Sequence, residues 1–575
     1  MFPREKPNSV TDIPISLEII RKGVVMVGHD VPVLIVGGSL VGMTSAVLLG
    51  KQGIPSLVVE RHQGTAIHPR AALILQRSME ILRGAGIEDV IQSRSVEQFD
   101  QDAAIMSVET LAGKEIAWHL PTLNEGVRDL SPCLRLFATQ VAIEPVLAER
   151  ARELGADIRF GTELVTFEDH GDGLTAVIRH RDTGKVSTVR ARYMIAADGA
   201  HSTIRDRLGI GVSGHGVLSK SITIYFRADV EALLRKRNLG VIMVVNETLQ
   251  GFFRIEKPYR SGFLAVHGLG DPQNPNSDIW TDLTDDRCVE LVRSALGDPD
   301  IEVQIDDVMR WQATAQVADS FQSGNVFLVG DSAHSMPPYG GYGGNTGIHD
   351  AHNLAWKIKA ALDGRAGAGL LATYDAERRP VARFTVEQAY GRYVTRAAPF
   401  LAVHGIEPLV SDADIDLGYR YRIETSDVGR TPEPVHGSPR ESAGAPGTRA
   451  PHHVLMRDGQ EISTHDLFGL NFVMLGAPEA DAWATAARTA VETAEVAIDV
   501  HRIGCVDGFG DVAGGFCAAY GISSTGMVLV RPDGFVAWRA VNGDAASTEA
   551  VIGALTAALE PGVVIQPPIG SGARR

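Results

Sequence analysis

The chain has 575 residues, 44% of them hydrophobic, which is enough for about two to four packed units with separate cores. Its 70 acidic and 54 basic residues give a formal net charge of −16, which repels nucleic acid phosphates and anionic membrane surfaces. The four cysteines form no CxxC pair and no metal-like cluster, so the sequence indicates neither a disulfide framework nor a metal site. We expect a cytoplasmic globular protein without nucleic-acid or membrane partners.

Residues 1–30 carry charges and lack the apolar region and cleavage site of a secretion signal, so we interpret them as an N-terminal extension. No apolar run approaches the roughly 20 residues that a membrane-spanning helix requires. The sequence therefore predicts no membrane segment.

The first clear element is a short apolar strand after Val31, which leads through glycines into an Ala/Leu-rich helix. The next strand ends at Glu60, where a dinucleotide-binding unit has the carboxylate that accepts hydrogen bonds from an adenosine ribose. In the pattern Gly37-x-Ser39-x-x-Gly42, serine replaces the second glycine, the position at which a pyrophosphate approaches the backbone. By itself this motif leaves open an α/β turn that binds nothing.

Two later strands also end in an aspartate. One precedes Asp198, in the motif Asp-Gly-Ala-His-Ser-Thr-Ile-Arg, and the other precedes Asp331. Open α/β sheets bind ligands at the carboxyl ends of their strands, so both carboxylates are candidate ligand contacts. For Asp198, an Asx-turn that caps a helix starting near Ser202 is an equally supported alternative.

A segment rich in proline and glycine follows Asp331 and precedes a helix that we expect to begin near Thr346. The prolines restrict the backbone and the glycines remove side chains, so peptide groups would face whatever binds there. The helix start adds unpaired N–H groups and about half a positive charge. These features suit the flat ring of a flavin, which becomes anionic at its pyrimidine edge on reduction. The segment contains Pro337, Pro338, Gly343, Gly344 and Asn345.

Taken in order, the motifs GGSLVG, Glu60-Arg61, DGAHSTIR and GDSAHSMPPYGGYGGNTG resemble the FAD-dependent aromatic hydroxylases, the single-component flavoprotein monooxygenases of the p-hydroxybenzoate hydroxylase type. The resemblance spans about residues 31 to 400. The segment around Arg70 and the helix pattern Gln140-x-x-x-Glu144 resemble the family's FAD-contacting segments. The resemblance implies Gly37, Ser39, Gly42 and Glu60 for the ADP half of FAD, Arg70 and Gln140 for its phosphates and ribityl chain, Asp331 for the ribityl hydroxyls, and Arg61, Asp198, Gly343, Gly344 and Asn345 as further cofactor contacts.

The family's activity implies a reaction as well. NAD(P)H, with NADPH favoured over NADH, would reduce FAD, and O₂ would form a flavin C4a-hydroperoxide that hydroxylates a phenolic ring in a cavity closed to water. Pro337 and Pro338 would form the flavin-facing loop of the catalytic site, with no side-chain base assigned. No second Gly-x-Gly-x-x-Gly follows a strand, so we expect NAD(P)H to bind transiently along the FAD domain.

Residues 207–305 contain alternating apolar runs that predict an antiparallel sheet with one covered face. In the family such a sheet covers the substrate cavity above the flavin. We expect substrate contacts from Tyr225, Met243 and Phe253, although apolar stripes of this kind also form plain core. The choice of a general base among Tyr225, Arg254 and His267 stays open.

The last part of the chain alternates strands and helices in the order of a thioredoxin fold. No cysteine stands after its first main strand, so dithiol chemistry is not expected. This part resembles the carboxyl-terminal domain of phenol hydroxylase-like proteins and of polyketide hydroxylases such as aklavinone and tetracenomycin hydroxylase. The resemblance implies a polycyclic aromatic, polyketide-type phenol as the substrate.

The predicted fold class is α/β with α+β parts: a Rossmann-like FAD-binding domain, an inserted antiparallel-sheet substrate domain and a carboxyl-terminal thioredoxin-like domain. The expected divisions are 1–30 as an extension, 31–206 and 306–400 as the two parts of the FAD-binding domain, 207–305 as the substrate domain, 401–447 as a linker and 448–575 as the thioredoxin-like domain.

Other interpretations stay open at this stage. The same flavin chemistry could perform a Baeyer-Villiger insertion or inactivate an antibiotic, and a non-catalytic flavin-binding or assembly protein is a further alternative. His349 and His352 share a helix face, but without a third ligand a zinc site is disfavoured against a solvated or cofactor-side face. Ser202 has no evident His/Asp partners for a hydrolase triad. Both a monomer and a homodimer remain open.

Overall fold

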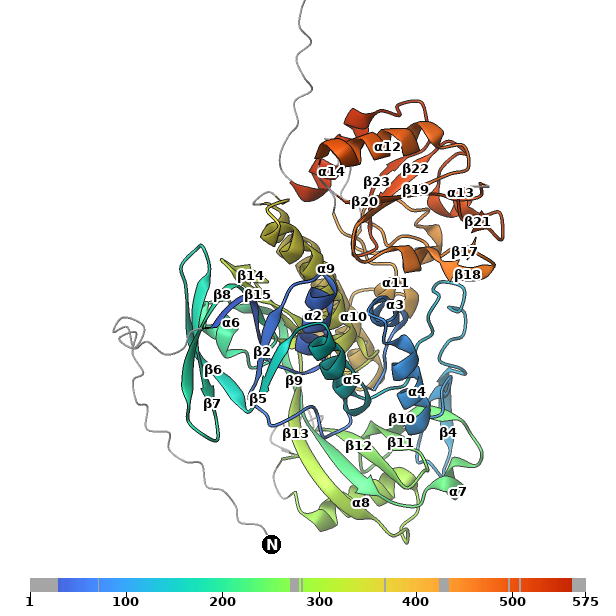
Figure 1. Cartoon of the computed structure of the whole chain (residues 1–575). Helices are drawn as coiled ribbons and strands as arrows, with labels where there is room; N and C mark the ends of the chain where they lie inside the picture. Colours follow the sequence, from blue (N-terminus) through green and yellow to red (C-terminus); the bar gives the residue numbers. More distant parts are fainter. Residues whose placement is uncertain are drawn as a thin grey trace, which may run out of the picture.

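The computed structural model describes residues 29–70, 72–268, 279–280, 283–366, 369–422, 434–494, 497–505 and 508–560. These residues form two large sheets and a carboxyl-terminal unit, which lies at the top of Figure 1 in orange and red. No helix in these ranges is long and apolar enough to span a membrane. The predicted 1–30 extension lies almost wholly outside the described residues.

The first sheet has the strand order β14-β15-β8-β1-β2-β5, with β7 pairing to β8 and β6 to β7. β1 runs parallel to β2 and β8, and Val33, Leu34 and Ile35 are fully buried because helices cover the sheet. Its strands are β1 (His29–Val36), β2 (Ser56–Glu60), β5 (Asp157–Phe160), β6 (Thr162–Asp169), β7 (Leu174–His180), β8 (Val186–Ala196), β14 (Gln322–Ser323) and β15 (Val326–Leu328).

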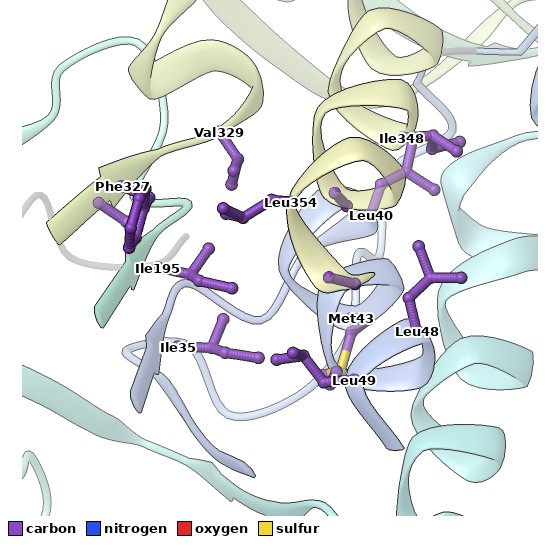
Figure 2. Packing of buried hydrophobic residues seen from close by; sticks show 14 of the residues in the cluster. Ile35, Leu40, Met43, Leu48, Leu49, Ile195, Phe327, Val329, Ile348 and Leu354 are labelled. Atoms are coloured by element: carbon purple, nitrogen blue, oxygen red, sulfur yellow. The ribbon is translucent and has the colours of Figure 1, made fainter. Parts of the chain in front are cut away.

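Helices α2 (Leu40–Lys51) and α9 (Tyr342–Leu362) pack together beside this sheet. Figure 2 shows strand residues such as Ile35 and Ile195 meeting Leu49 of α2 and Leu354 of α9 in one buried cluster. The core thereby joins the first strand, which begins at His29, to a helix that begins at Tyr342. The other helices of this part are α3 (Gln76–Gly84), α4 (Glu88–Gln98), α5 (Gln140–Glu153), α6 (Thr203–Arg207) and α10 (Gly369–Arg396).

The second sheet has the order β16-β13-β9-β12-β11-β10-β3-β4. It is mostly antiparallel, as predicted, but it also includes strands from residues 104–120 and 306–335 and is therefore larger than the predicted range 207–305. The extra pairing is long-range, since β10 lies parallel to β3 with Met243 opposite Ser107. The strands are β3 (Ala104–Val108), β4 (Glu115–Leu120), β9 (Val212–Arg227), β10 (Leu239–Val245), β11 (Gln250–Glu256), β12 (Ser261–Gly268), β13 (Gln304–Ala318) and β16 (His334–Ser335).

The carboxyl-terminal unit contains a four-stranded sheet in the order β20-β19-β22-β23. β19 is parallel to β20 and antiparallel to β22, and the helices α12 and α14 pack against each other beside it, as a thioredoxin-like order predicts. A small sheet, β18-β17-β21, joins two strands that precede β19 to one that follows β20. The elements are β17 (Val454–Arg457), β18 (Gln460–Ser463), β19 (Phe472–Gly476), α12 (Asp481–Ala494), β20 (Ile498–Arg502), β21 (Gly510–Asp511), α13 (Phe516–Tyr520), β22 (Met527–Val530), β23 (Val536–Ala540) and α14 (Thr548–Leu559).

A buried ionic network attaches this unit to helices α9 and α10. The Glu377 carboxylate accepts hydrogen bonds from Arg531 Nη1 at 2.7 Å and Nη2 at 2.9 Å, and from Lys357 Nζ at 2.7 Å. Arg531 also donates to Asp533, and each of these four side chains is at most 6% exposed. The carboxyl-terminal unit is therefore fixed to the same helix whose start lies near the predicted flavin.

Candidate active site

The turn after β1 has room for glycine alone at two of its predicted positions. Gly37 has a φ of +104°, and a Cβ atom on it would lie 2.2 Å from the Ala197 carbonyl oxygen. A Cβ atom on Gly42 would lie 1.8 Å from the Gly37 carbonyl oxygen. These contacts are the tight turn and the close helix-strand approach that the dinucleotide fingerprint requires.

Ser39, the departure from the fingerprint, has a partner on another helix. Its hydroxyl donates to Glu144 Oε1 of α5 at 2.5 Å, and the same oxygen accepts the Leu40 amide at 3.0 Å. Glu144 Oε2 accepts the Ala66 amide at 2.7 Å, so this carboxylate fastens the loop after β2 to the start of α2. The predicted helix pattern included Glu144 but gave it no role, although its position one helical turn after Gln140 could have indicated one.

Gln140 and Arg70 meet beside this turn. The backbone amide of Gln140 donates to the Arg70 carbonyl oxygen at 3.0 Å, and the side-chain Nε2 of Gln140 donates to Ser39 Oγ at 3.3 Å. The Arg70 and Arg61 side chains are both exposed. Three segments that are distant in sequence thus converge, with Arg70 free to reach an anionic ligand.

Glu60 closes the same turn from β2. Its Oε2 accepts the Gly38 amide at 2.7 Å and its Oε1 accepts the His62 amide at 2.8 Å. Each carboxylate oxygen has a second acceptor position, so the predicted hydrogen bonds from a ribose remain compatible with this arrangement.

The two carboxylate oxygens of Asp198 differ in their hydrogen bonds. Its Oδ2 accepts the Ile204 amide of α6 at 3.2 Å, a bond across six residues that supports the helix start without the two-residue Asx-turn of the alternative. Its buried Oδ1 has no hydrogen-bond partner within the described ranges, and burial raises the pKa of the carboxyl. The residue therefore combines the capping role with one acceptor that is available to a ligand.

Two side chains that the sequence did not single out fix the aspartate turns: Arg205 joins the Asp198 turn to the Asp331 turn, and Asp350 fastens the Asp331 turn to α9. Arg205 donates to the Ser332 carbonyl oxygen and to the Ala200 carbonyl oxygen, both at 3.1 Å. Asp350 accepts the Gly330 amide at 3.0 Å and binds His334 Nε2 at 2.8 Å. Neither side chain is predictable from local pattern, because each acts between segments that meet only after folding.

Asp331 lies in a 3-10 turn after β15 and is an exposed residue. The protein atoms packed around it nonetheless desolvate its carboxylate, which raises the pKa of Asp331. An accessible carboxylate inside a protein-walled site is suited to hydrogen bonds with ligand hydroxyls.

Helix α9 begins at Tyr342, four residues before the predicted start near Thr346. Gly341 is the N-cap with a φ of +69°, and Tyr342 is buried with its hydroxyl donating to Asp412 Oδ1 at 2.5 Å, so packing starts the helix early. Gly343 and Gly344 therefore lie in its first turn, where amides lack intrahelical partners.

The Asn345 side chain is fully engaged by the protein. Its Oδ1 accepts the Leu75 amide at 3.0 Å, while its Nδ2 donates to the Leu73 carbonyl oxygen at 3.0 Å and to the Gly341 carbonyl oxygen at 2.7 Å. The side chain therefore positions the segment after Arg70 against the start of α9, and its backbone amide is the part left for a cofactor.

The turn between β16 and α9 faces the second sheet. Pro337 is buried and Pro338 is exposed. The centroid of the buried Tyr339 ring lies 5.7 Å from the ring centroid of His267 in β12 and 5.3 Å from that of Tyr393 in α10. The predicted flavin-facing loop is thus next to the sheet that we expect to cover the substrate.

Strand alternation separates the three predicted substrate contacts. Met243 pairs with Phe252 and packs against Tyr339, on the face directed toward the turn. Tyr225 is on this face too, and its ring stacks on the His68 ring with the two centroids 4.7 Å apart. Phe253 points the other way, into the core with helix α8 (Asp285–Leu296). The prediction for Phe253 is therefore wrong, because it was made from composition without knowledge of which face is covered.

Of the three candidate bases, only Arg254 is charged near pH 7. Burial raises the pKa of Tyr225 to about 12 and lowers the pKa of Arg254 to about 9, so both keep their protons near pH 7. Arg254 lies between the rings of Phe99 and Phe137, each centroid 4.4 Å from its guanidinium carbon. Burial lowers the pKa of His267 to about 4, which leaves a neutral imidazole.

The two helix histidines and Ser202, which the sequence disfavoured as zinc ligands or as a hydrolase nucleophile, have other protein partners. His349 Nε2 lies 3.2 Å from Ser78 Oγ, and His352 Nδ1 lies 3.4 Å from Arg77. In the part of the chain that the structure describes, no three His, Cys, Asp or Glu side chains are grouped as a metal site. Ser202 accepts the Arg205 amide at 3.0 Å as the N-cap of α6, which is a structural role.

These residues fit FAD. The glycine turn, the unsatisfied Asp198 oxygen, the accessible Asp331 carboxylate and the amides at the start of α9 lie at one edge of the first sheet, next to the second sheet. Carboxylates suit ribose and ribityl hydroxyls, and a helix start suits the electron-rich edge of a reduced flavin.

Comparison with known proteins agrees with this geometry. Residues 30–389 match the family model of the FAD binding domain, and residues 443–561 match that of the aromatic-ring hydroxylase C-terminal domain. The chain is 49% identical to 4-methyl-5-nitrocatechol 5-monooxygenase of a Burkholderia species, over 91% of this chain and 97% of that protein. It is 38% identical to tetracenomycin B2 monooxygenase-dioxygenase of Streptomyces olivaceus, over 89% and 95%. A ternary complex of aklavinone-11 hydroxylase with FAD and aklavinone superimposes with a TM-score of 0.86 at 34% identity, over 93% of this chain and 100% of that chain.

Proposed function

This chain belongs to the FAD-dependent aromatic-ring hydroxylases, a family of monooxygenases, and we propose that it hydroxylates a phenolic ring held between the second sheet and the Pro337–Tyr339 turn. The observation that carries the proposal is this juxtaposition. Tyr339, in the loop that leads to the start of α9, lies against His267 of the second sheet. An aromatic ring placed there would adjoin a flavin whose edge faces α9.

When bound, FAD supplies the electrons taken from NAD(P)H and the activation of O₂ that this family uses. The chain's own residues would bind FAD and enclose the site of the reaction. Gly37, Ser39, Gly42, Glu60 and Arg61 would surround the ADP half, and Arg70, Gln140, Asp198, Asp331 and the amides of Gly343, Gly344 and Asn345 would surround the rest. NADPH is the reductant that we favour.

The enclosing side chains also exclude water. Tyr339, Tyr393 and His267 are each at most 5% exposed, and Met243 packs against the buried cluster that contains both tyrosines. A dry cavity protects a reactive oxygen species from unproductive breakdown. Pro337 and Pro338 position the loop, and no side chain acts as a base in this proposal.

The substrate class that we propose first is a polycyclic aromatic, polyketide-type phenol, because relatives are named putative polyketide hydroxylase, tetracenomycin B2 monooxygenase-dioxygenase and aklavinone-11 hydroxylase. A specific observation favours a second candidate, a substituted single-ring catechol. The identity to the methylnitrocatechol monooxygenase is 49%, against 38% for the tetracenomycin enzyme, and both alignments cover nearly the whole proteins.

Product analysis separates the candidates. The purified holoenzyme is incubated with NADPH or NADH, air and one member of a panel of hydroxyanthraquinones and nitrocatechols, and products are analysed by mass spectrometry. We expect the substrate to accelerate NAD(P)H consumption and to give a hydroxylated product. A ring-expanded lactone would indicate Baeyer-Villiger insertion instead. A colourless protein that does not retain added FAD would refute the proposal.

A further inference from the structure

Two buried polar groups without hydrogen-bond partners lie beside the Pro337–Tyr339 turn. His267 of β12 is 4% exposed and Tyr393 of α10 is fully buried, and their rings are 5.9 Å apart. Among the described residues, neither His267 Nε2 nor the Tyr393 hydroxyl has a partner at full hydrogen-bond geometry, although the Ser219 side chain lies near the Tyr393 hydroxyl. Tyr339 contacts both rings, so the two unpaired atoms belong to one small region of the site.

The surroundings fix the imidazole. His267 Nδ1 lies 3.3 Å from Ser221 Oγ, which lies 3.2 Å from Ser219 Oγ. The rings of Trp311 and Phe252 lie 5.9 Å and 6.1 Å from the imidazole centroid. Nδ1 is therefore engaged within the sheet, and Nε2 is the imidazole atom left for a ligand.

Unpaired polar atoms in a protein interior are costly, because they lose their hydrogen bonds to water and gain none. A buried polar group without a partner in a native structure therefore calls for an explanation, and a catalytic or binding role is one. Burial holds the pKa of His267 near 4 and raises that of Tyr393, so both groups are neutral at pH 7. A neutral donor and a neutral acceptor suit an uncharged oxygen.

We propose that His267 and Tyr393 together bind a hydroxyl group of the aromatic substrate and make the enzyme select hydroxylated rings over their methyl ethers. This inference rests on the proposed function, since it assumes that the ring lies on this face of the second sheet. One hydroxyl can donate to one of the two groups while it accepts from the other. A methyl ether has no hydrogen to donate, so it leaves one of the two atoms unpaired.

The test measures binding, not turnover. 4-Nitrocatechol and its dimethyl ether, and 1,2-dihydroxyanthraquinone and its dimethyl ether, are titrated into the oxidised holoenzyme while the flavin absorbance is followed. The variants are Tyr393→Phe and His267→Phe, and the control is Tyr390→Phe on the same helix. We expect each site variant to weaken the better-bound hydroxylated probe about tenfold and its ether less than about twofold.

Several results would overturn the proposal. These are equal losses for the hydroxylated probe and its ether, wild-type binding of the ether as tight as that of the hydroxylated probe, or no response to either hydroxylated probe. Retained selective binding without any oxygenated product would instead refute the proposed function and leave this site standing.

A thermal readout separates ligand binding from a structural role. Tyr393→Phe removes a hydroxyl that has no partner, so we expect an unchanged or higher unfolding midpoint. Tyr390→Phe removes a hydrogen bond to the Leu401 carbonyl oxygen at 3.0 Å, so it should lower the midpoint without changing probe affinity. A midpoint loss for Tyr393→Phe as large as that for Tyr390→Phe would assign the hydroxyl to structure and contradict the proposal.

Discussion

Removal of one charge from the Glu377 network should destabilise the protein far more than removal of a surface charge on the same helix. Glu377→Gln leaves Lys357 and Arg531 buried without their shared carboxylate. Breaking a buried ion pair from one side costs about 3–5 kcal/mol. Burial raises the pKa of Glu377, but the pairing with Arg531 and Lys357 outweighs it and lowers the pKa from 4.5 to about 2, which corresponds to roughly 3 kcal/mol.

The matched control is Arg379→Met, which breaks the partly exposed pair with Asp375 on α10 and should cost about 0–1 kcal/mol. Urea unfolding of the holoenzyme, followed by tryptophan fluorescence, measures both changes. Trp356 is a suitable reporter, because the Arg531 guanidinium lies 5.1 Å from its ring.

The pH dependence adds a second check on the same variant. A carboxyl with a lowered pKa contributes stability that is complete above its unfolded pKa and is lost as the pH falls through its folded pKa. The difference between wild type and Glu377→Gln should therefore be full above pH 4.5 and narrow as the pH falls toward 2. A difference no larger than that of Arg379→Met at neutral pH would refute the reasoning.

Three further changes test the site. Gly42→Ala should abolish FAD retention, because its Cβ would lie 1.8 Å from the Gly37 carbonyl oxygen, whereas Gly553→Ala, with open space around it, should leave the flavin content of the purified protein unchanged. Phe253→Ala should cost about 3–5 kcal/mol in urea unfolding but leave the affinity for aromatic probes intact, and a specific loss of affinity would contradict its position in the core. Glu144→Gln keeps the shape of the side chain but weakens the charge-assisted hydrogen bonds to Ser39, Leu40 and Ala66. The affinity for FAD, measured by fluorescence, should therefore fall several-fold. An unchanged affinity would show that Glu144 does not support the cofactor site.

The sequence by itself determined the parts of this protein that depend on local chemistry. The turn at Gly37 and Gly42 follows from the absence of side chains, and the spacing to Glu60 follows from the length of one strand-helix-strand unit. The order of strands and helices after residue 448 likewise identified a thioredoxin-like unit. Steric restriction and hydrophobic periodicity act over a few residues, so they can be read without knowledge of the rest of the chain.

Only the tertiary structure decided which side chains meet. Phe252 and Phe253 are adjacent and chemically identical, but pairing with β10 and packing on α8 direct one toward the site and the other into the core. His267 and Tyr393 come from different elements, and their side chains become neighbours only when α10 packs against the second sheet. Such contacts depend on register and on long-range packing, to which no local pattern of residues corresponds.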